Sequence, residues 1–486
     1  MSKNNTSSTN TLVSNGKSRE GKKFPQYKAA LTVCLGSVAT GSVLGWTSNI
    51  SVEMKRGDYN EISIDDDSLG WIGSFATLGA MVMCFPIGFM CEKLGRKAAM
   101  LLLTIPFIIG WLLIIFANSL IMIYIGRFIC GMAGGAFCVS APMYTSEIAE
   151  KEIRGALGSY FQLLLTVGIL FSYIMGLAVD PKTYTIVLAV IPLVFAAAFF
   201  FEPETPVYRM KQKREAEARE SLLRLRGSAY DVDAELKEIK TTLEEEENNH
   251  ISFSESFKKR STKLATLICF SLMFFQQASG VNAVIFYTSS IFESAGSKLD
   301  PKIATIIVGV IQCVSTFIAS LIVDRLGRRI LLLGSALCMA IAGTLLGIFF
   351  TLKEREIVDA DTITTLGFLP ILALSIFMVV FSLGFGPIPW MISSELFPSE
   401  IKSVAISAAG TFNWFIAFLI TKFYLNLKNA VGGDVTFYIF SVVSVVGTIF
   451  VFFVVPETKG KSLDQIQREL NGEKNSSDGN DNLGFS

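Results

Sequence analysis

Long apolar runs alternate with short polar breaks along most of the chain. Each run extends for about 20 residues, the length that a helix needs to cross a hydrocarbon core of about 30 Å. Six runs precede a charged segment at 202–262 and six follow it. The expected spans are 28–50, 69–91, 98–117, 120–142, 155–178, 183–201, 263–293, 302–323, 330–350, 366–392, 403–426 and 435–455. The pattern predicts an all-α integral membrane protein with twelve transmembrane helices.

Basic residues near the ends of the runs predict the orientation, because cytoplasmic loops are enriched in Lys and Arg. They are Lys17, Arg19, Lys22 and Lys23 before the first span, Lys93, Arg96 and Lys97 after the second, and Arg325, Arg328 and Arg329 after the eighth. The first loop on the other side carries the acidic run 65–67. We therefore expect both termini and the central segment to face the cytoplasm. The plasma membrane is the expected location of the protein.

Short motifs recur in the same order in the two groups of six runs. Residues 92–97, Glu-Lys-Leu-Gly-Arg-Lys, recur as 324–329, Asp-Arg-Leu-Gly-Arg-Arg, and 203–205 recur as 456–458, Pro-Glu-Thr. Parallel repeats of this kind are typical of carriers in which two bundles move about a central site. We expect a disordered tail at 1–27, a first bundle at 28–201, a linker at 202–262, a second bundle at 263–455 and a second cytoplasmic tail at 456–486. The first tail lacks the pattern of a signal peptide.

The composition narrows the class of function. Hydrophobic residues make up 51% of the chain and charged residues 17%, while 42 basic residues balance 42 acidic ones. A balanced charge gives no reason to expect a nucleic-acid partner. All eight cysteines lie in or beside apolar runs, so we expect neither a disulfide nor a metal site. The chain shows no nucleophile, metal or phosphate constellation, which argues against an enzyme, and we expect no cofactor.

The central segment is rich in helix-forming residues. Residues 207–226 and 231–249 combine Glu, Lys, Arg, Ala and Leu with opposite charges at helical spacing. One interpretation is a solvated linker, and the other is a set of short helices that joins the cytoplasmic faces of the two bundles.

Charged side chains at the cytoplasmic helix ends form a matched set in the two halves. They are Glu92, Arg96, Glu147, Arg154 and Glu204 in the first half, and Asp324, Arg328, Glu395, Lys402 and Glu457 in the second. Opposite charges on neighbouring helices in a poorly hydrated setting form strong pairs. We expect a latch that closes the inner face when the carrier opens outward, although the same residues could simply fix topology and tight turns.

Uncharged amides gather within the spans. Gln162 lies about two turns after Arg154, and the seventh span contains Gln276, Gln277 and Asn282 around a Ser-Gly step at 279–280. Asn413 in the eleventh span and Gln312 in the eighth extend the set. Carboxamides donate and accept hydrogen bonds at once, which suits a ring of hydroxyl groups. Any single amide could instead bond a neighbouring helix, but several at similar depth predict a binding site for a sugar-like molecule.

Aromatic rings complete the predicted site, because the C–H faces of a sugar ring pack on flat side chains. Trp390 follows the run Gly-Phe-Gly-Pro-Ile-Pro at 384–389, which removes backbone donors and breaks the tenth span. Broken helices at membrane depth line cavities in transporters. Trp390 and Trp414 are therefore the two candidate stacking residues.

Acidic residues are missing from the middle of the spans. The fifth, eleventh and twelfth spans contain no Asp or Glu, and elsewhere the acids lie near the span ends. A proton-coupled carrier needs a titratable group in its path, and His250, the only histidine, lies in the linker. The sequence favours uniport, with proton symport as the alternative.

The motifs together resemble the sugar porter family of the major facilitator superfamily, from about residue 30 to 462. The matching residues are Gly126-Arg127, Pro142 and Tyr144 before Glu147, Arg154-Gly155, Pro203-Glu204-Thr205-Pro206, Gln276-Gln277 with Ser279-Gly280 and Asn282, Gly386 to Trp390, and Pro456 to Gly460. Residues 44–48, Leu-Gly-Trp-Thr-Ser, and 412–414, Phe-Asn-Trp, resemble the facilitated trehalose transporters of insects and the class III glucose facilitators.

The resemblance implies a major facilitator fold and sugar contacts from Gln162, Gln276, Gln277, Asn282, Trp390 and Asn413. Thr47, which we include in the candidate site with Gln312, stands where proton-coupled relatives carry Asp. Three positions depart from the family pattern. Val207 replaces a common Arg, with Arg209 nearby, Phe286 replaces a common Tyr, and Ser382 replaces a common Glu.

The sequence leaves the substrate open among trehalose, glucose, fructose and a polyol. A sugar sensor that does not transport is a further alternative, although only a short segment follows Pro456. Asn49 begins an Asn-Ile-Ser sequon, but it lies so close to a span that we do not expect glycosylation. The expected partners are a small sugar and the lipid bilayer, and we expect a monomer.

Overall fold

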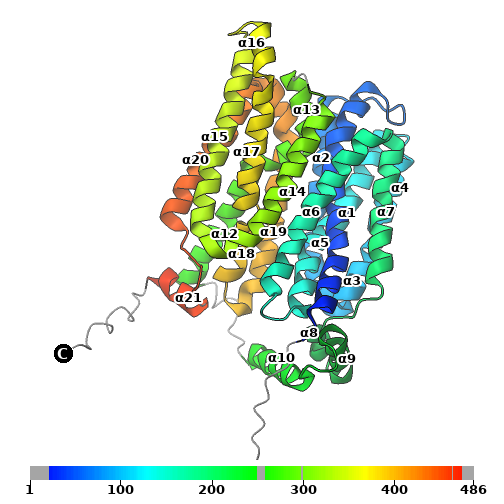
Figure 1. The fold of residues 1–486 in the computed structure, drawn as a ribbon, viewed down its shortest axis with the longest axis vertical. Coiled ribbons are helices and arrows are strands. Elements are labelled where there is room, and N and C mark those ends of the chain that lie inside the picture. The colour runs from blue at the N-terminus through cyan, green and yellow to red at the C-terminus, as the bar shows by residue number, and fades with distance from the viewer. Residues whose placement is uncertain (1–20, 249–257, 297–298, 462, 473–486) are drawn as a thin grey trace, which may run out of the picture.

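The computed structural model describes residues 21–248, 258–296, 299–461 and 463–472. Within them, twelve helical segments are long and apolar enough to cross a membrane, as the sequence predicted. They form two bundles of six that stand side by side (Figure 1).

The first bundle comprises six spans, one of them built from two helices. They are α1 (Lys23–Arg56), α2 (Asp66–Leu94), α3 (Arg96–Leu102) with α4 (Thr104–Ile115), α5 (Leu120–Ile148), α6 (Arg154–Ala178) and α7 (Pro181–Phe199). α1 begins five residues earlier than expected, so residues 23–27 belong to the first helix and not to a disordered tail.

The second bundle contains two interrupted spans. It comprises α12 (Arg260–Ala278) with α13 (Val281–Ala295), α14 (Pro301–Leu326), α15 (Arg328–Glu354), then α16 (Ala360–Thr365), η1 (Leu366–Phe368), α17 (Leu369–Leu383) and α18 (Ile388–Leu396), and finally α19 (Ser399–Val431) and α20 (Gly433–Val454).

Local sequence signals set several of the helix starts. The side chains of Asp65, Asp180 and Asp300 accept hydrogen bonds from backbone N–H groups in the first turns of α2, α7 and α14. A proline follows directly in α7 and α14, where the missing N–H costs nothing.

The linker folds into α8 (Pro206–Lys211), α9 (Glu215–Arg226) and α10 (Val232–Asn248). The helix-rich segment 207–226 is divided between α8 and α9, because the chain turns at 212–214, where Lys213 has φ of 59°. A further helix, α21 (Leu463–Asn471), lies in the segment that we expected to be a tail. Ile466 and Leu470 of α21 are buried, and α21 packs on α12 and α18.

Small residues allow the helices of the first bundle to cross closely. A Cβ atom added to Gly131 of α5 would lie 2.0 Å from the backbone oxygen of Ala76 in α2, and one added to Gly168 of α6 would lie 2.2 Å from that of Val38 in α1. Backbones that approach this closely are typical of membrane helices, where van der Waals contact drives association.

Within the described residues, the most extensive contacts between the two bundles run along three helix pairs. α2 packs along α19, α6 along α14, and α1 against α13. We call the end of the molecule that carries α8, α9, α10 and α21 the terminal face, and the other end, which carries α16, the distal face (Figure 1).

Candidate functional site

Two helices of the second bundle break at the depth of the predicted site. α12 ends at Ala278 and α13 begins at Val281, with Gly280 between them at φ of 88°. A side chain is disfavoured at this positive φ, and a Cβ atom there would lie 2.5 Å from Phe440. α17 ends at Leu383 and α18 begins at Ile388. Pro387 and Pro389 explain this second break because neither can donate a helical hydrogen bond.

Four of the predicted amides lie together at these breaks. Asn282 Nδ2 donates to Gln277 Oε1 at 2.7 Å, and Gln277 Nε2 donates to Asn413 Oδ1 at 2.9 Å. Asn413 Nδ2 donates to Gln276 Oε1 at 2.7 Å. All four side chains are buried. We call this chain of hydrogen bonds the amide relay.

The two remaining predicted amides lie on the pair of helices where the bundles face each other. Gln162 of α6 is half-buried, and Gln312 of α14 is buried. One turn after Gln162, the Thr166 hydroxyl lies 3.8 Å from the sulfur of Cys313. Residues four apart share a helix face, so Gln162 lies on the side of α6 that faces α14.

The two candidate stacking residues lie on or beside α19: Trp414 belongs to this helix, and Trp390 of α18 packs against it. The half-buried ring of Trp390 lies against Gly410, where an added Cβ would meet it at 3.3 Å. Trp414 is buried and lines a small cavity with Thr40, Leu44 and Gly134 of the first bundle. Among the described residues, no oxygen or nitrogen atom accepts a hydrogen bond from the Nε1–H group of Trp414, and the Cys84 thiol lies beside it. A thiol is a weak hydrogen-bond acceptor, so an N–H group in a cavity between the bundles suits a hydroxylated ligand.

Thr47, which we included in the candidate site, contacts a buried cation in this conformation. It is fully buried, and its hydroxyl accepts a hydrogen bond of 2.9 Å from Arg127 Nη2. The buried Arg127 guanidinium also donates to the backbone oxygens of Val43 and Ile72 and lies over the Trp46 ring. Neutral acceptors therefore hold this buried cation, and the Thr47 hydroxyl is already engaged.

At the terminal face of the first bundle, the latch candidates pair with one another. Arg96 Nη2 lies 2.9 Å from Glu147 Oε1, and the Thr205 hydroxyl donates to Glu147 Oε2 at 2.5 Å. Glu204 accepts hydrogen bonds from the backbone N–H groups of Lys97 and Thr205. Burial raises the pKa of Glu204, and these N–H groups oppose the rise.

The second bundle repeats the arrangement. Arg328 Nη2 lies 3.1 Å from Glu395 Oε1, and the Thr458 hydroxyl donates to Glu395 Oε2 at 2.6 Å. Glu457 accepts from the backbone N–H groups of Arg328 and Arg329. Burial acts to raise the pKa of Glu457, but the N–H donors outweigh it and lower the pKa. These pairs run within each bundle, so here they fix turns and helix ends.

The other latch candidates contribute less in this conformation. Glu92 and Arg154 are exposed, and Arg154 donates to the backbone oxygen of Ala149 at 3.4 Å. Lys402 is half-buried. The side chain of Asp324 lies outside the described residues. At the departure from the family pattern, Arg209 pairs with Glu217 of α9 at 2.7 Å.

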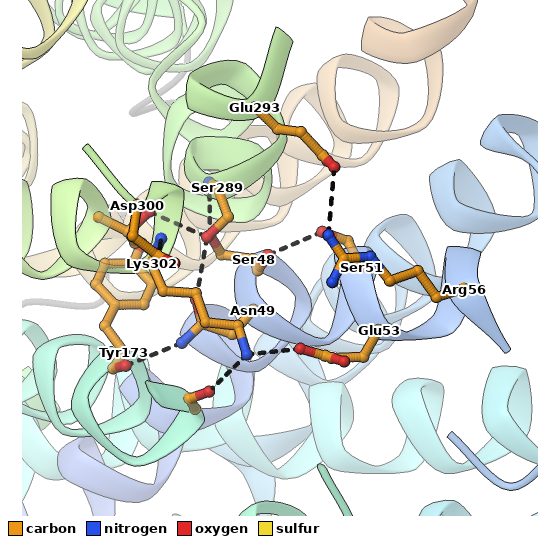
Figure 2. Close-up of polar contacts among 12 residues, drawn as sticks. Ser48, Asn49, Ser51, Glu53, Arg56, Tyr173, Ser289, Glu293, Asp300 and Lys302 are labelled. Carbon is orange, nitrogen blue, oxygen red and sulfur yellow. Dashed lines mark hydrogen bonds and ion pairs between the residues drawn. The ribbon is translucent and has the colours of Figure 1, made fainter. Parts of the chain in front are cut away.

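Polar contacts join the two bundles at the distal face, and sequence reasoning missed them (Figure 2). Lys302 Nζ of α14 lies 2.6 Å from Glu53 Oε1 of α1, and Lys422 Nζ of α19 lies 2.6 Å from Asp67 Oδ1 of α2. Arg56 and Glu293 approach to 3.9 Å. We call these ion pairs, with the hydroxyl and amide contacts described next, the distal closure.

Small polar side chains fill the centre of the distal closure. Ser48 and Ser289 lie 3.2 Å apart, Ser51 and Ser290 lie 3.1 Å apart, and Ser289 donates to Asn49 Oδ1 at 3.0 Å (Figure 2). Asn49 Nδ2 donates to the Tyr173 backbone oxygen, and only 2% of Asn49 is exposed. The side chain of Asn49 is therefore inaccessible in this conformation.

Arg226 fixes the linker helices beneath the first bundle. Its side chain is 1% exposed and pairs with Glu235 of α10 at 2.8 Å and with Glu150 at 3.3 Å. It also donates to the backbone oxygen of Ile148, while its own backbone oxygen accepts from Lys22. Acidic and basic residues recur along α9 as they do in a solvated helix, so no sequence pattern distinguishes the buried Arg226 from its exposed neighbours.

Comparisons with known proteins agree with the fold and the family resemblance. Residues 29–470 match the family model described as sugar (and other) transporter. The chain is 40% identical over 450 residues to the facilitated trehalose transporter Tret1 of Culex quinquefasciatus, a match that spans 92% of this chain and 86% of that protein. It is also 40% identical over 451 residues to Tret1 of Anopheles gambiae, of which it spans 56%.

Solved structures show the same fold. The partially occluded inward-open form of the xylose transporter XylE from E. coli aligns with a TM-score of 0.75 at 23% identity, over 90% of this chain and 99% of that one. A structure described as a D-xylose-proton symporter aligns with a TM-score of 0.69 at 24% identity. Because these identities are below 25%, the likeness establishes the fold alone, and the substrate and its coupling must be inferred from the residues of this chain.

Proposed function

Because this chain belongs to the sugar transporter family of the major facilitator superfamily, we propose that it moves trehalose or a hexose such as glucose by uniport. The protein is an integral membrane sugar transporter, and the proposal concerns its substrate and its energetics. The relatives at 40% identity are described as facilitated trehalose transporters, which supports trehalose as the first candidate.

The observation that supports uniport most directly is the environment of Arg127. This buried guanidinium bonds two backbone oxygens and the Thr47 hydroxyl, none of which titrates in the physiological range. A carboxylate at Thr47 could take up and release a proton beside Arg127, and its ionisation would change the charge of the site. Threonine removes that possibility while keeping a hydrogen-bond acceptor.

Proton symport is the second candidate because two of the structural neighbours are described as proton symporters. Their identity to this chain is 22% and 24%. Glu53 is the carboxylate of α1 that faces the second bundle, where it pairs with Lys302. Symport through Glu53 would make the distal closure the site of proton coupling.

The binding site of this proposal combines amides and rings at the level of the helix breaks. The amide relay offers donors and acceptors to hydroxyl groups, and Trp390 and Trp414 offer apolar faces. Gln162 and Gln312 add amides from α6 and α14, where the two bundles face each other.

In a carrier that opens to one side of the membrane at a time, the function of the distal closure is to seal the distal side. The basic residues at the terminal face favour a cytoplasmic location for it, so the distal face is extracellular and this conformation is closed to the outside. Opening outward breaks the contacts of Lys302 and Lys422 with the first bundle. The charged side chains of the terminal face then become available to join the bundles there.

Equilibrium counterflow in proteoliposomes tests the substrate. Purified full-length protein is loaded with unlabelled sugar and supplied with a trace of labelled trehalose, glucose or fructose. Exchange of labelled trehalose or glucose, lost in Asn282→Ala, supports the proposal. Exchange of neither sugar would contradict it, and binding without exchange would favour a sensor.

A further inference from the structure

Basic residues are concentrated where the seventh span begins. Lys258 and Lys259 precede α12, and Arg260 and Lys263 lie in its first turn. All four are exposed. The first turn of α12 lies at the terminal face, where α21 packs on the helix (Figure 1). We call these four residues the basic cluster.

The basic cluster lacks the acidic partners that other cations of the terminal face have. Lys461 pairs with Glu469 of α21, and at the matching end of the first bundle Lys28 of α1 pairs with Glu202 at 2.9 Å. Among the residues that the structure describes, no carboxylate forms an ion pair with any member of the cluster. The charge of the cluster is therefore available to an external anion.

One face of α12 joins this charge to an apolar surface. Arg260, Lys263, Leu267 and Phe274 are exposed and form one stripe, because positions three, four and seven apart share a helix face. Leu267 is 54% exposed and Phe274 is 38% exposed, whereas Ala265 on the opposite face is fully buried. Lys263 and Leu267 lie about one helical turn apart, so one bound molecule can contact both.

The stripe faces lipid, because helices of the second bundle flank it on both sides. Phe270 lies against Phe412 of α19 with ring centroids 5.2 Å apart, and Phe275 lies against Phe450 of α20 at 5.6 Å. On the flanking helix α20, Phe453 is 77% exposed. Apolar exposure that continues from one helix to its neighbour marks a surface that contacts the membrane.

We propose that the basic cluster and the apolar stripe of α12 bind an anionic phospholipid of the cytoplasmic leaflet. The four cations attract the headgroup, and Leu267 and Phe274 contact the acyl chains. Lys and Arg next to a membrane span strengthen the attraction to anionic lipid by about fivefold for each charge. The proposal concerns the lipid partner of the transporter and does not depend on which sugar it carries.

Lipid titration of the full-length protein, followed by native mass spectrometry, measures the affinity. Purified protein in detergent micelles receives phosphatidylserine or phosphatidylcholine, which differ in net charge and carry the same acyl chains. We expect the wild type to bind its first phosphatidylserine more tightly than its first phosphatidylcholine. Arg260→Gln combined with Lys263→Gln should weaken the binding of phosphatidylserine by about 25-fold, or about fivefold for each charge, and leave phosphatidylcholine unchanged.

Lys237→Gln combined with Lys240→Gln is the matched control. Both side chains are exposed on α10, away from any span, and the net charge of the protein falls by the same amount. This variant should bind phosphatidylserine as the wild type does. An equal loss in the two double variants would indicate a general effect of charge and would overturn the proposal. So would an unchanged preference for phosphatidylserine after Arg260 and Lys263 are replaced.

Photo-crosslinking of the wild-type protein covers the case in which the double variant does not fold. Liposomes contain phosphatidylserine or phosphatidylcholine with the same photoreactive group near the headgroup. Phosphatidylserine should label the peptide that covers residues 258–275 more heavily than phosphatidylcholine does, and equal labelling would refute the site.

Glycerophosphoserine, which is the same headgroup without acyl chains, separates a membrane lipid from a soluble phosphate compound. It should leave the labelling by phosphatidylserine unchanged at an equal concentration, because it lacks the chains that contact the apolar stripe. Displacement of the lipid would show that the cluster binds soluble phosphates, and the assignment to a phospholipid would fail.

Discussion

Removing the charge of Glu53 should shift the protein toward the conformation that is open at the distal face. Glu53 and Lys302 are 16% and 23% exposed at the side chain and 2.6 Å apart, so water screens them only partly. At an effective dielectric constant of about 20, their attraction is about 6 kcal/mol before the cost of desolvation. Measured couplings of close charge pairs at interfaces begin at about 1.5 kcal/mol, and we take that value for the net effect.

A change of about 1.5 kcal/mol alters the conformational equilibrium roughly tenfold. The assay is the labelling rate of a reporter cysteine at Ser290, 6% exposed at the distal closure, with an impermeant thiol reagent added from the distal side. The reporter removes the same contact with Ser51 in every background, so its cost cancels in the comparison. Glu53→Gln should raise the labelling rate about tenfold.

The control is Arg56→Gln, which removes another charge pair between the bundles. Arg56 is 63% exposed and lies 3.9 Å from Glu293, and exposed pairs contribute between 0 and about 1 kcal/mol. Its labelling rate should stay within a few-fold of the parent. Equal rates for the parent and Glu53→Gln, or an equal rise in Arg56→Gln, would refute the role of the buried pair.

Three further predictions concern other parts of the molecule. Arg226→Ala leaves Glu150 and the linker helices without their buried partner, which should reduce the stability of their packing by about 3–5 kcal/mol. Limited proteolysis should then cleave the variant within 227–248 at protease concentrations that leave the wild type intact. Thr47→Asp places a titratable group beside Arg127, so its transport rate should depend on pH between 5 and 8 more steeply than that of the wild type, and equal pH profiles would contradict this reasoning. Gly131→Ala should abolish the folded protein in size-exclusion chromatography because its Cβ would lie 2.0 Å from a backbone oxygen of α2, whereas Gly158→Ala, with open space around its Cβ, should elute as the wild type.

The twelve spans were predictable because each crossing helix must present an apolar surface long enough for the bilayer. The helix ends were less predictable than the spans. α1 extends back to Lys23, through residues that face water and the linker helices and not lipid. α21 was missed because its short sequence is mostly polar. Of its three apolar residues, Ile466 and Leu470 are buried, and their burial depends on contacts with α12 and α18.

The residue types of the site were predictable, and their partners were not. The amides at 276, 277, 282 and 413 do come together, but their order of donation depends on how α12, α13 and α19 are placed against one another. The link between Thr47 and Arg127 joins α1 to α5, and no local pattern reveals it. The serines of the distal closure resemble ordinary small residues of a packed membrane helix, so only the meeting of α1 with α13 shows their role.

The central claim, that the sugar moves without a coupled proton, is tested most directly by the steady-state distribution of sugar across a vesicle membrane. Proteoliposomes containing the wild-type protein receive an inward proton gradient and a labelled sugar that the counterflow assay has shown to exchange. Uniport predicts that the inside concentration rises to the outside value and stops there, with or without the gradient. A steady-state inside concentration above the outside value, abolished by a protonophore, would contradict the account.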